Sequence, residues 1–179
     1  MAARRGGRLA ERARRVRLAV FDVDGVLTDG TVYLSATGEE TKAFNIQDGL
    51  GLKMLAASGV HTAIISGRKS PIVRLRARET GIAHVYQGIG DKLDAWRKLL
   101  GKLGLTAAES SFMGDDLPDL PVLTRCGVAF SVPGAPDIVR GHAHYVTRAA
   151  GGRGAVREAC ELLMRAQGSL DRQLKGFLR

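Results

Sequence analysis

Short apolar runs rich in Val, Ile and aromatic residues alternate along this chain with longer segments of helical periodicity. The apolar runs predict strands at 16–23, 60–66, 84–87, 110–114 and 127–132. Between them, apolar residues recur with the 3.6-residue period of one-sided helices in 49–58, 70–80 and 91–103. Strands that alternate with helices pair in parallel through right-handed crossovers. The pattern therefore predicts an α/β fold, a Rossmann-like open parallel sheet flanked by helices.

The composition is that of one soluble globular domain. The chain has 179 residues, of which 45% are hydrophobic and 25% charged, enough for a full core. No apolar run is long enough to span a membrane, and the N-terminus lacks the apolar region of a secretory signal. Cys126 and Cys160 show no metal-ligand spacing. We therefore expect a cytoplasmic protein with reduced thiols and no membrane partner.

The positive charge is concentrated at the N-terminus. Residues 1–17 hold seven arginines against Glu11, so this segment carries +6 of the net +9. We expect residues 1–15 to form a solvated, flexible arm, although a basic arm can also touch nucleic acid or an acidic surface. The arm lacks interleaved aromatic residues, which argues against a nucleic-acid partner. The main folded domain then covers 16–168, and 169–179 form a tail.

One segment interrupts the alternation of strands and helices. The stretch TVYLSATGEETKAF (31–44) contains two short β-like runs around Ala36-Thr37-Gly38, directly after the first strand. This pattern predicts an inserted β-hairpin. No separate cap domain is indicated anywhere in the chain.

Polar side chains follow the predicted strands where each strand ends. Asp22 and Asp24 end the first strand, Ser66 ends the second, Lys92 follows the third, and Asp115 follows the fourth. Each has an ordinary explanation alone, such as a helix cap, a surface lysine or a turn. The carboxyl ends of parallel strands meet at one edge, where ligands of open α/β sheets bind. We therefore expect these side chains to form one site.

Phosphoryl transfer suits this set of side chains. A carboxylate can attack phosphorus, and a second acid can protonate the leaving alkoxide and later deprotonate water. Carboxylate oxygens such as those of Asp22 and Asp115 are suitable ligands for Mg²⁺. A hydroxyl and an ammonium can hold the non-bridging oxygens of the phosphoryl group.

The motifs DVDGVLTD, IISGR, GDK and GDDLPD, in this order, resemble the four motifs of the haloacid dehalogenase (HAD) phosphatase superfamily. FNIQDGLGLK (44–53), GIAHVYQG (81–88) and YVTRAAGGRGAVREACELL (145–163) resemble the 3-deoxy-D-manno-octulosonate 8-phosphate phosphatases over residues 16–170. The resemblance implies a capless, Mg²⁺-dependent homotetramer that hydrolyses a sugar-acid phosphate for lipopolysaccharide synthesis. It makes 31–44 the oligomerisation hairpin.

The resemblance also implies roles for individual residues. Asp22 is the nucleophile and a metal ligand, Asp24 is the general acid/base and binds the metal through its backbone carbonyl, and Asp115 is the third metal ligand. Ser66 and Lys92 hold the phosphoryl group, and Asp116 and Asp119 orient Lys92 and metal-bound water. The residues expected to meet the substrate are Asp24, Asn45, Ile46, Gln47, Asp48, Gly49, Lys53, Arg68, Arg76 and Lys92.

The C-terminal run 151–168 has one apolar helical face, formed by Ala155, Val156, Ala159, Leu162 and Leu163, after a Gly-Gly pair. In the resembled family such a tail can fold over the active site of a neighbouring subunit. We therefore expect its removal to impair turnover more than folding.

Two other functions remain open at this stage. A nonulosonate 9-phosphate phosphatase shares the four motifs, but that group tends to place an acidic residue at the position of Arg68. A non-catalytic tetrameric scaffold, or a nucleic-acid binder acting through the arginine arm, belongs to a different class. The complete set of Asp22, Asp24, Ser66, Lys92 and Asp115 argues against the scaffold.

Overall fold

Six parallel strands form the central sheet. The computed structural model describes residues 2–178, and the side chains of residues 2–6 lie outside the described part. The strand order is β5-β4-β1-β6-β7-β8, and each neighbouring pair is parallel. The strands are β1 (Leu18–Phe21), β4 (His61–Ser66), β5 (His84–Gln87), β6 (Ser110–Met113), β7 (Val128–Ser131) and β8 (Tyr145–Val146). The predicted sheet is confirmed, and β8 extends it at one edge.

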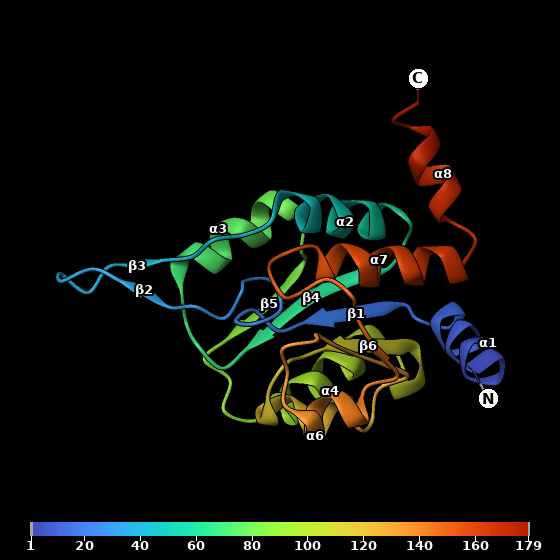
Figure 1. Cartoon of the computed structure of the whole chain (residues 1–179), viewed down its shortest axis with the longest axis horizontal. Helices are drawn as coiled ribbons and strands as arrows, with labels where there is room; N and C mark the ends of the chain where they lie inside the picture. The colour runs from blue at the N-terminus through green and yellow to red at the C-terminus, as the bar shows by residue number, and fades with distance from the viewer. Residues whose placement is uncertain (1, 179) are drawn as a thin grey trace.

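Helices cover both faces of this sheet, as Figure 1 shows. One face carries α2 (Ile46–Ala57), α3 (Pro71–Thr80) and α7 (Ala155–Ala166), and the other carries α4 (Lys92–Leu103) and α6 (Asp137–His142). The short helix α5 (Leu120–Leu123) packs against α4 and α6. Every residue of β1, β6 and β7 is buried. Burial on both faces explains the continuous apolar run of β1 (LAVF), whereas β6 (SSFM) begins with two buried serines.

Strand β1 is the point at which the chain changes direction across the sheet. From β1 the chain moves to β4 and β5 on one side, and it then crosses back to β6, β7 and β8 on the other side. In the sheet register Phe21 lies between Ile64 of β4 and Met113 of β6. Such a reversal opens a crevice at the carboxyl ends of the strands, where Asp22 follows Phe21.

The inserted hairpin extends away from the body of the molecule (Figure 1). It consists of β2 (Tyr33–Leu34) and β3 (Glu40–Thr41), paired antiparallel as a separate two-stranded sheet. Its turn is closed by a hydrogen bond from the amide of Gly38 to the carbonyl of Ser35, and Gly38 has the left-handed φ of 81° that glycine permits. The hairpin prediction is thus confirmed. Apart from this hairpin, residues 2–178 contain no inserted domain after β1.

The described part of the N-terminal segment differs from the flexible arm that its arginines suggested. Residues Ala2–Arg14 form helix α1, which packs against α7. Ala13 and Val16 are buried, and the side-chain amide of Gln167 donates hydrogen bonds to both of their carbonyls. The many arginines of this segment obscured the few apolar residues through which the short helix packs. Met1 and Arg179, at the ends of the expected arm and tail, lie outside the described residues.

Helix α7 belongs to the core of its own subunit, and a lid over a neighbouring subunit stays a prediction. It packs against α2 of its own chain, and its buried residues are Ala155, Val156, Ala159, Cys160, Leu163 and Met164. The predicted apolar face is present, but it packs into the core of the same subunit. Helix α8 (Leu170–Lys175) follows, and only its first residue, Leu170, is buried.

Candidate active site

The sheet places Asp22 and Ser66 side by side. The amide of Asp22 donates a hydrogen bond of 3.0 Å to the carbonyl of Met113, which continues the pairing of β1 with β6 by one residue. Ser66 is the last residue of β4, and the side chains of both residues are buried. Their positions are therefore fixed by backbone hydrogen bonds of the central strands.

Lys92 joins two carboxylates in this crevice. It is the first residue of α4, and its Nζ lies 2.9 Å from Oδ2 of Asp22 and 2.7 Å from Oδ1 of Asp119. Burial alone would lower the pKa of Lys92, but the charges of Asp22 and Asp119 outweigh it and raise this pKa above its ordinary value. The ammonium therefore stays charged and compensates the aspartates.

Asp119 is fully buried, and both of its oxygens have partners. Oδ1 accepts the hydrogen bond from Lys92, and Oδ2 accepts from the amides of Asp115 and Asp116 at 3.0 and 3.2 Å. Asp119 is the last residue of the short 3₁₀ helix Leu117–Asp119. It ties the loop after β6 to Lys92, the contact that its implied orienting role requires.

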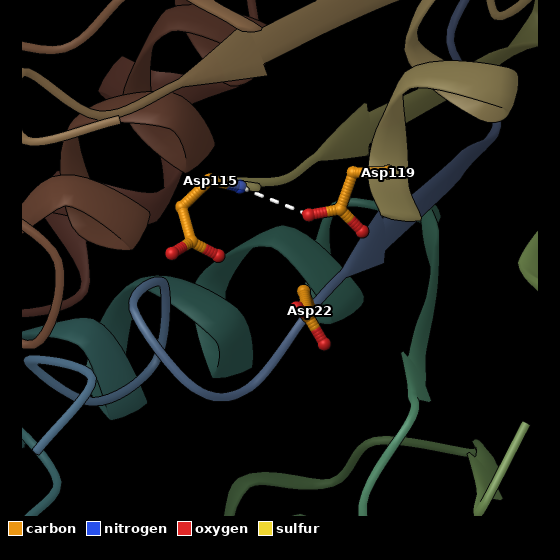
Figure 2. A group of neighbouring side chains, drawn as sticks. All are labelled: Asp22, Asp115 and Asp119. Carbon is orange, nitrogen blue, oxygen red and sulfur yellow. Dashed lines mark hydrogen bonds between the residues drawn. The ribbon is translucent and has the colours of Figure 1, made fainter. Parts of the chain in front are cut away.

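Asp22 and Asp115 each have one buried carboxylate oxygen without a hydrogen-bond partner. Both Oδ1 atoms are buried and accept no hydrogen bond from the described residues. Figure 2 shows the carboxylates of Asp22, Asp115 and Asp119 gathered at the end of β1, with one ligand atom of each within 4.8 Å of the others. Because burial leaves two acceptors without a donor, this arrangement of carboxylate oxygens fits a cation.

The pKa values report the same shortage of positive charge. Burial, assisted by Asp119 and opposed by Lys92, raises the pKa of Asp22 to about 6. Burial and the neighbouring charges of Asp22, Asp119 and Asp116 raise the pKa of Asp115 to about 7. A divalent cation between the two carboxylates would favour their ionised forms.

Close backbone packing sets the position of the loop after β1. Gly25 has a φ of 85°, and a Cβ on it would lie 2.0 Å from Oδ2 of Asp115. On the opposite side, a Cβ on Gly151 would lie 1.8 Å from the carbonyl oxygen of Gly25. The Gly-Gly pair before α7 thus permits contact between the C-terminal segment and the loop after β1.

The catalytic groups open onto a cavity of about 490 Å³, whose lining includes Asp22, Asp24, Ser66, Arg68, Lys92 and Asp115. A larger hollow of about 600 Å³ lies between α3 and β5, beside Arg74 and Tyr86. It contains none of the predicted catalytic residues. The chemistry of its lining, and not its size, identifies the smaller cavity as the candidate active site.

Comparison with known proteins gives the family. No protein-family model matches the chain. The chain is 48% identical over 160 residues to the 3-deoxy-D-manno-octulosonate 8-phosphate phosphatase KdsC of Escherichia coli K12, which covers 89% of this chain and 85% of that protein. The chain belongs to the 3-deoxy-D-manno-octulosonate 8-phosphate phosphatase family.

Solved structures agree with this family. The phosphatase of Moraxella catarrhalis, crystallised with a magnesium ion, a phosphate ion and a KDO molecule, is 44% identical with a TM-score of 0.93, over 94% of this chain and 97% of that one. A putative HAD superfamily hydrolase of Legionella pneumophila is 40% identical with a TM-score of 0.95, over 99% of this chain and 97% of that one. The resemblance to the HAD superfamily and to the octulosonate phosphatases is confirmed. Within residues 2–178, no helix combines the length and hydrophobicity needed to cross a bilayer.

The predicted sugar-acid residues do not converge on Asp22 within one chain of this phosphatase family member. Arg68 lines the catalytic cavity, whereas Asn45, Ile46 and Gln47 line a separate hollow of about 310 Å³. Asn45 caps α2, because its Oδ1 accepts the amides of Gln47 and Asp48. These residues remain predictions for substrate binding that depend on a neighbouring subunit.

The other predicted residues are held by contacts within the subunit. Asp48 is buried and accepts hydrogen bonds from the amides of Gly154 and Arg157 at the start of α7. Gly49 faces the guanidinium of Arg76, which donates to the carbonyl of Asn45 at 2.8 Å, and Lys53 is exposed on α2. Asp48 and Arg76 therefore have structural contacts that the motif pattern did not indicate.

Two charged residues of the hairpin were missed by sequence reasoning. Lys42 forms ion pairs with Asp24 and with Glu40, and Arg68 contacts the same two carboxylates. In the sequence Lys42 looks like a surface lysine of a polar turn region. Its partner Asp24 is eighteen positions away, so no local pattern could reveal the pair.

Proposed function

We propose that this protein is an Mg²⁺-dependent phosphatase that hydrolyses 3-deoxy-D-manno-octulosonate 8-phosphate in lipopolysaccharide precursor synthesis. One observation carries the proposal. Asp22 is buried at the end of β1, with one oxygen on Lys92 and the other without a partner, in a chain of the octulosonate phosphatase family. A nucleophile and a metal ligand need these two oxygens in this arrangement.

The reaction proceeds in two displacements. In the first, a carboxylate oxygen of Asp22 attacks phosphorus, the bond to the sugar oxygen breaks, and Asp24 gives its proton to the departing alkoxide. In the second, Asp24 takes a proton from water, which attacks the aspartyl-phosphate and releases phosphate with Asp22 restored. Ser66 and Lys92 hold the phosphoryl oxygens, and Lys92 retains its place through Asp119.

The residues present fit a magnesium ion. The unpartnered oxygens of Asp22 and Asp115 are hard donors, whereas both oxygens of Asp119 already have partners. Asp22, Asp115 and the backbone carbonyl of Asp24 would hold the ion. When bound, Mg²⁺ supplies the positive charge that lets the nucleophile approach an anionic phosphate.

We further propose a homotetramer in the cytoplasm. Val32, Tyr33 and Leu34 of the hairpin are 39%, 50% and 66% exposed, and a two-stranded hairpin alone is barely stable in water. Hairpins of four subunits that pair with one another would cover this apolar surface. The same assembly would bring residues of a neighbouring subunit, among them Asn45 to Gly49, Lys53 and Arg76, toward the open catalytic cavity. The two free, buried cysteines suit a reducing compartment.

A phosphate-release assay on a panel of sugar-acid phosphates tests the proposal. We expect turnover of 3-deoxy-D-manno-octulosonate 8-phosphate that is abolished by chelation and restored by Mg²⁺. The variant Asp22→Asn should keep the fold, as judged by circular dichroism, and lose several orders of magnitude in kcat. A preference for a nonulosonate 9-phosphate would replace the proposed substrate, and turnover by Asp22→Asn would refute the mechanism.

A further inference from the structure

The side chain of Lys42 is buried at the base of the hairpin. It is 2% exposed, and its ammonium pairs with Oδ1 of Asp24 and lies 3.4 Å from Oε1 of Glu40. A buried ammonium is strongly unfavourable unless carboxylates compensate it. The chain therefore directs a cation from the hairpin onto the carboxylate that serves as acid/base in the proposed function.

The two oxygens of Asp24 have different surroundings. Oδ1 is held by the buried Lys42, whereas Oδ2 lies 3.6 Å from Nε of Arg68, whose side chain is 51% exposed. The Lys42 side chain is enclosed, whereas the half-exposed Arg68 side chain has solvent beside it. Oδ2 is thus the oxygen that remains available to exchange a proton with the leaving group.

We propose that Lys42 is a positioning residue for the general acid Asp24, holding Oδ1 so that Oδ2 faces the leaving oxygen. The inference rests on the proposed phosphatase function and names a residue that the four HAD motifs do not contain. Proton transfer is efficient only at hydrogen-bond distance, and a misplaced group can cost about 100-fold in rate. Glu40, 16% exposed, supports Lys42 from the hairpin side.

The test compares Lys42→Met with wild type on aryl phosphates of graded leaving-group basicity, from p-nitrophenyl to phenyl phosphate. These esters carry no carboxylate, so sugar-acid recognition does not enter. The ratio kcat/KM reports the steps up to departure of the phenol and excludes the later hydrolysis of the phosphoenzyme. Basic leaving groups need the proton of Asp24, whereas p-nitrophenolate leaves without it.

We expect Lys42→Met to lower kcat/KM by roughly 10- to 100-fold for phenyl phosphate and less than about 3-fold for p-nitrophenyl phosphate. Lys42→Arg should recover most of the loss, and Lys42→Met should add nothing in an Asp24→Asn background. Lys98→Met is the matched control, because Lys98 pairs with Asp94 on the exposed face of α4. Should Lys42→Met fail to fold, the double variant Lys42→Met/Glu40→Gln serves the same comparison, because it also removes the Glu40 charge that would be left unpaired.

Equal losses on all aryl phosphates would show that Lys42 only anchors the hairpin, and would overturn the inference. A loss that persists in the Asp24→Asn background would do the same. Both outcomes leave the proposed function standing, since the wild type still releases phosphate. Wild-type protein that hydrolyses no phosphate ester would instead remove the function and the inference together.

Discussion

The carboxyl edge of the sheet and the segment 31–53 contrast in how their polar and apolar groups are satisfied. At the sheet edge, Lys92 compensates Asp22 and Asp119 inside one chain, and Oδ1 of Asp22 and Oδ1 of Asp115 are buried without a hydrogen-bond partner among the described residues. In the segment 31–53, Leu34 is 66% and Ile46 is 84% exposed. The charged groups of the sheet edge therefore find partners within one chain, whereas the segment 31–53 presents apolar side chains to water.

The physical origin of this difference is the sheet. Backbone hydrogen bonds between β1, β4 and β6 of the same chain position the side chains at the sheet edge, so their placement does not require another subunit. The hairpin has only two residues in each strand and no place in the central sheet. We therefore propose that one chain supplies the catalytic groups and that the proposed assembly supplies the sugar-acid recognition.

Removal of the C-terminal helices should have the largest effect on stability and activity. It tests whether α7 is part of the core that supports the sheet edge. Because α7 packs against α2, truncation after Thr147 should abolish cooperative unfolding in urea and activity on every substrate. Truncation after Gly168 removes only α8, whose buried residue is Leu170, and should cost about 2 kcal/mol. If the protein truncated after Thr147 folded but had impaired turnover, the result would instead support a C-terminal lid over the active site of a neighbouring subunit.

Lys92→Met tests whether Lys92 is the counter-charge of Asp22 and Asp119 at the sheet edge. It leaves two buried carboxylates without their cation, so we expect the free energy of unfolding without Mg²⁺ to fall by about 3 kcal/mol and kcat to drop at least 100-fold. Lys98→Met removes an exposed i,i+4 pair on the same helix and should change stability by less than about 0.5 kcal/mol. Similar effects of the two substitutions would mean that Lys92 is not the buried counter-charge.

The motifs predicted this edge because strand ends are read from local pattern, and parallel strands bring distant ends together. This local pattern was sufficient to place four residues at the edge: Asp22, Ser66, Lys92 and Asp115. The contacts that pattern missed join positions far apart, such as Lys42 with Asp24 or Asp48 with the start of α7. Helix α1 was missed because the seven arginines of residues 1–17, five of them in the helix, obscured the few apolar residues that pack it on α7.

The pH dependence of stability gives a smaller effect at the same edge. In chelator, the pKa of Asp22 is about 6 and that of Asp115 about 7, both above the ordinary value of 3.8. Between the ordinary pKa of 3.8 and the raised values of about 6 and 7, the folded state therefore binds more protons than the unfolded state. The free energy of unfolding should fall by about 1–3 kcal/mol as the pH rises from about 5 to about 8.

Mg²⁺ should remove most of this decline, because the bound ion favours both ionised carboxylates. Asp115→Asn should flatten the profile without metal. Urea titrations at several pH values, with chelator and with Mg²⁺, measure the effect. A stability that rises with pH in chelator would contradict the assignment of these two carboxylates as uncompensated.

The most direct test of the contrast between the two regions is a monomeric variant. Leu34→Asp places a charge on the exposed hairpin surface, far from the buried core, and light scattering should report a monomer instead of a tetramer. We predict that its kcat/KM for p-nitrophenyl phosphate stays within about 3-fold of wild type, because the catalytic edge is intact. For 3-deoxy-D-manno-octulosonate 8-phosphate, KM should rise at least about 10-fold, because the neighbour's recognition residues are gone. A monomer that keeps the wild-type KM for the sugar-acid phosphate would contradict the account.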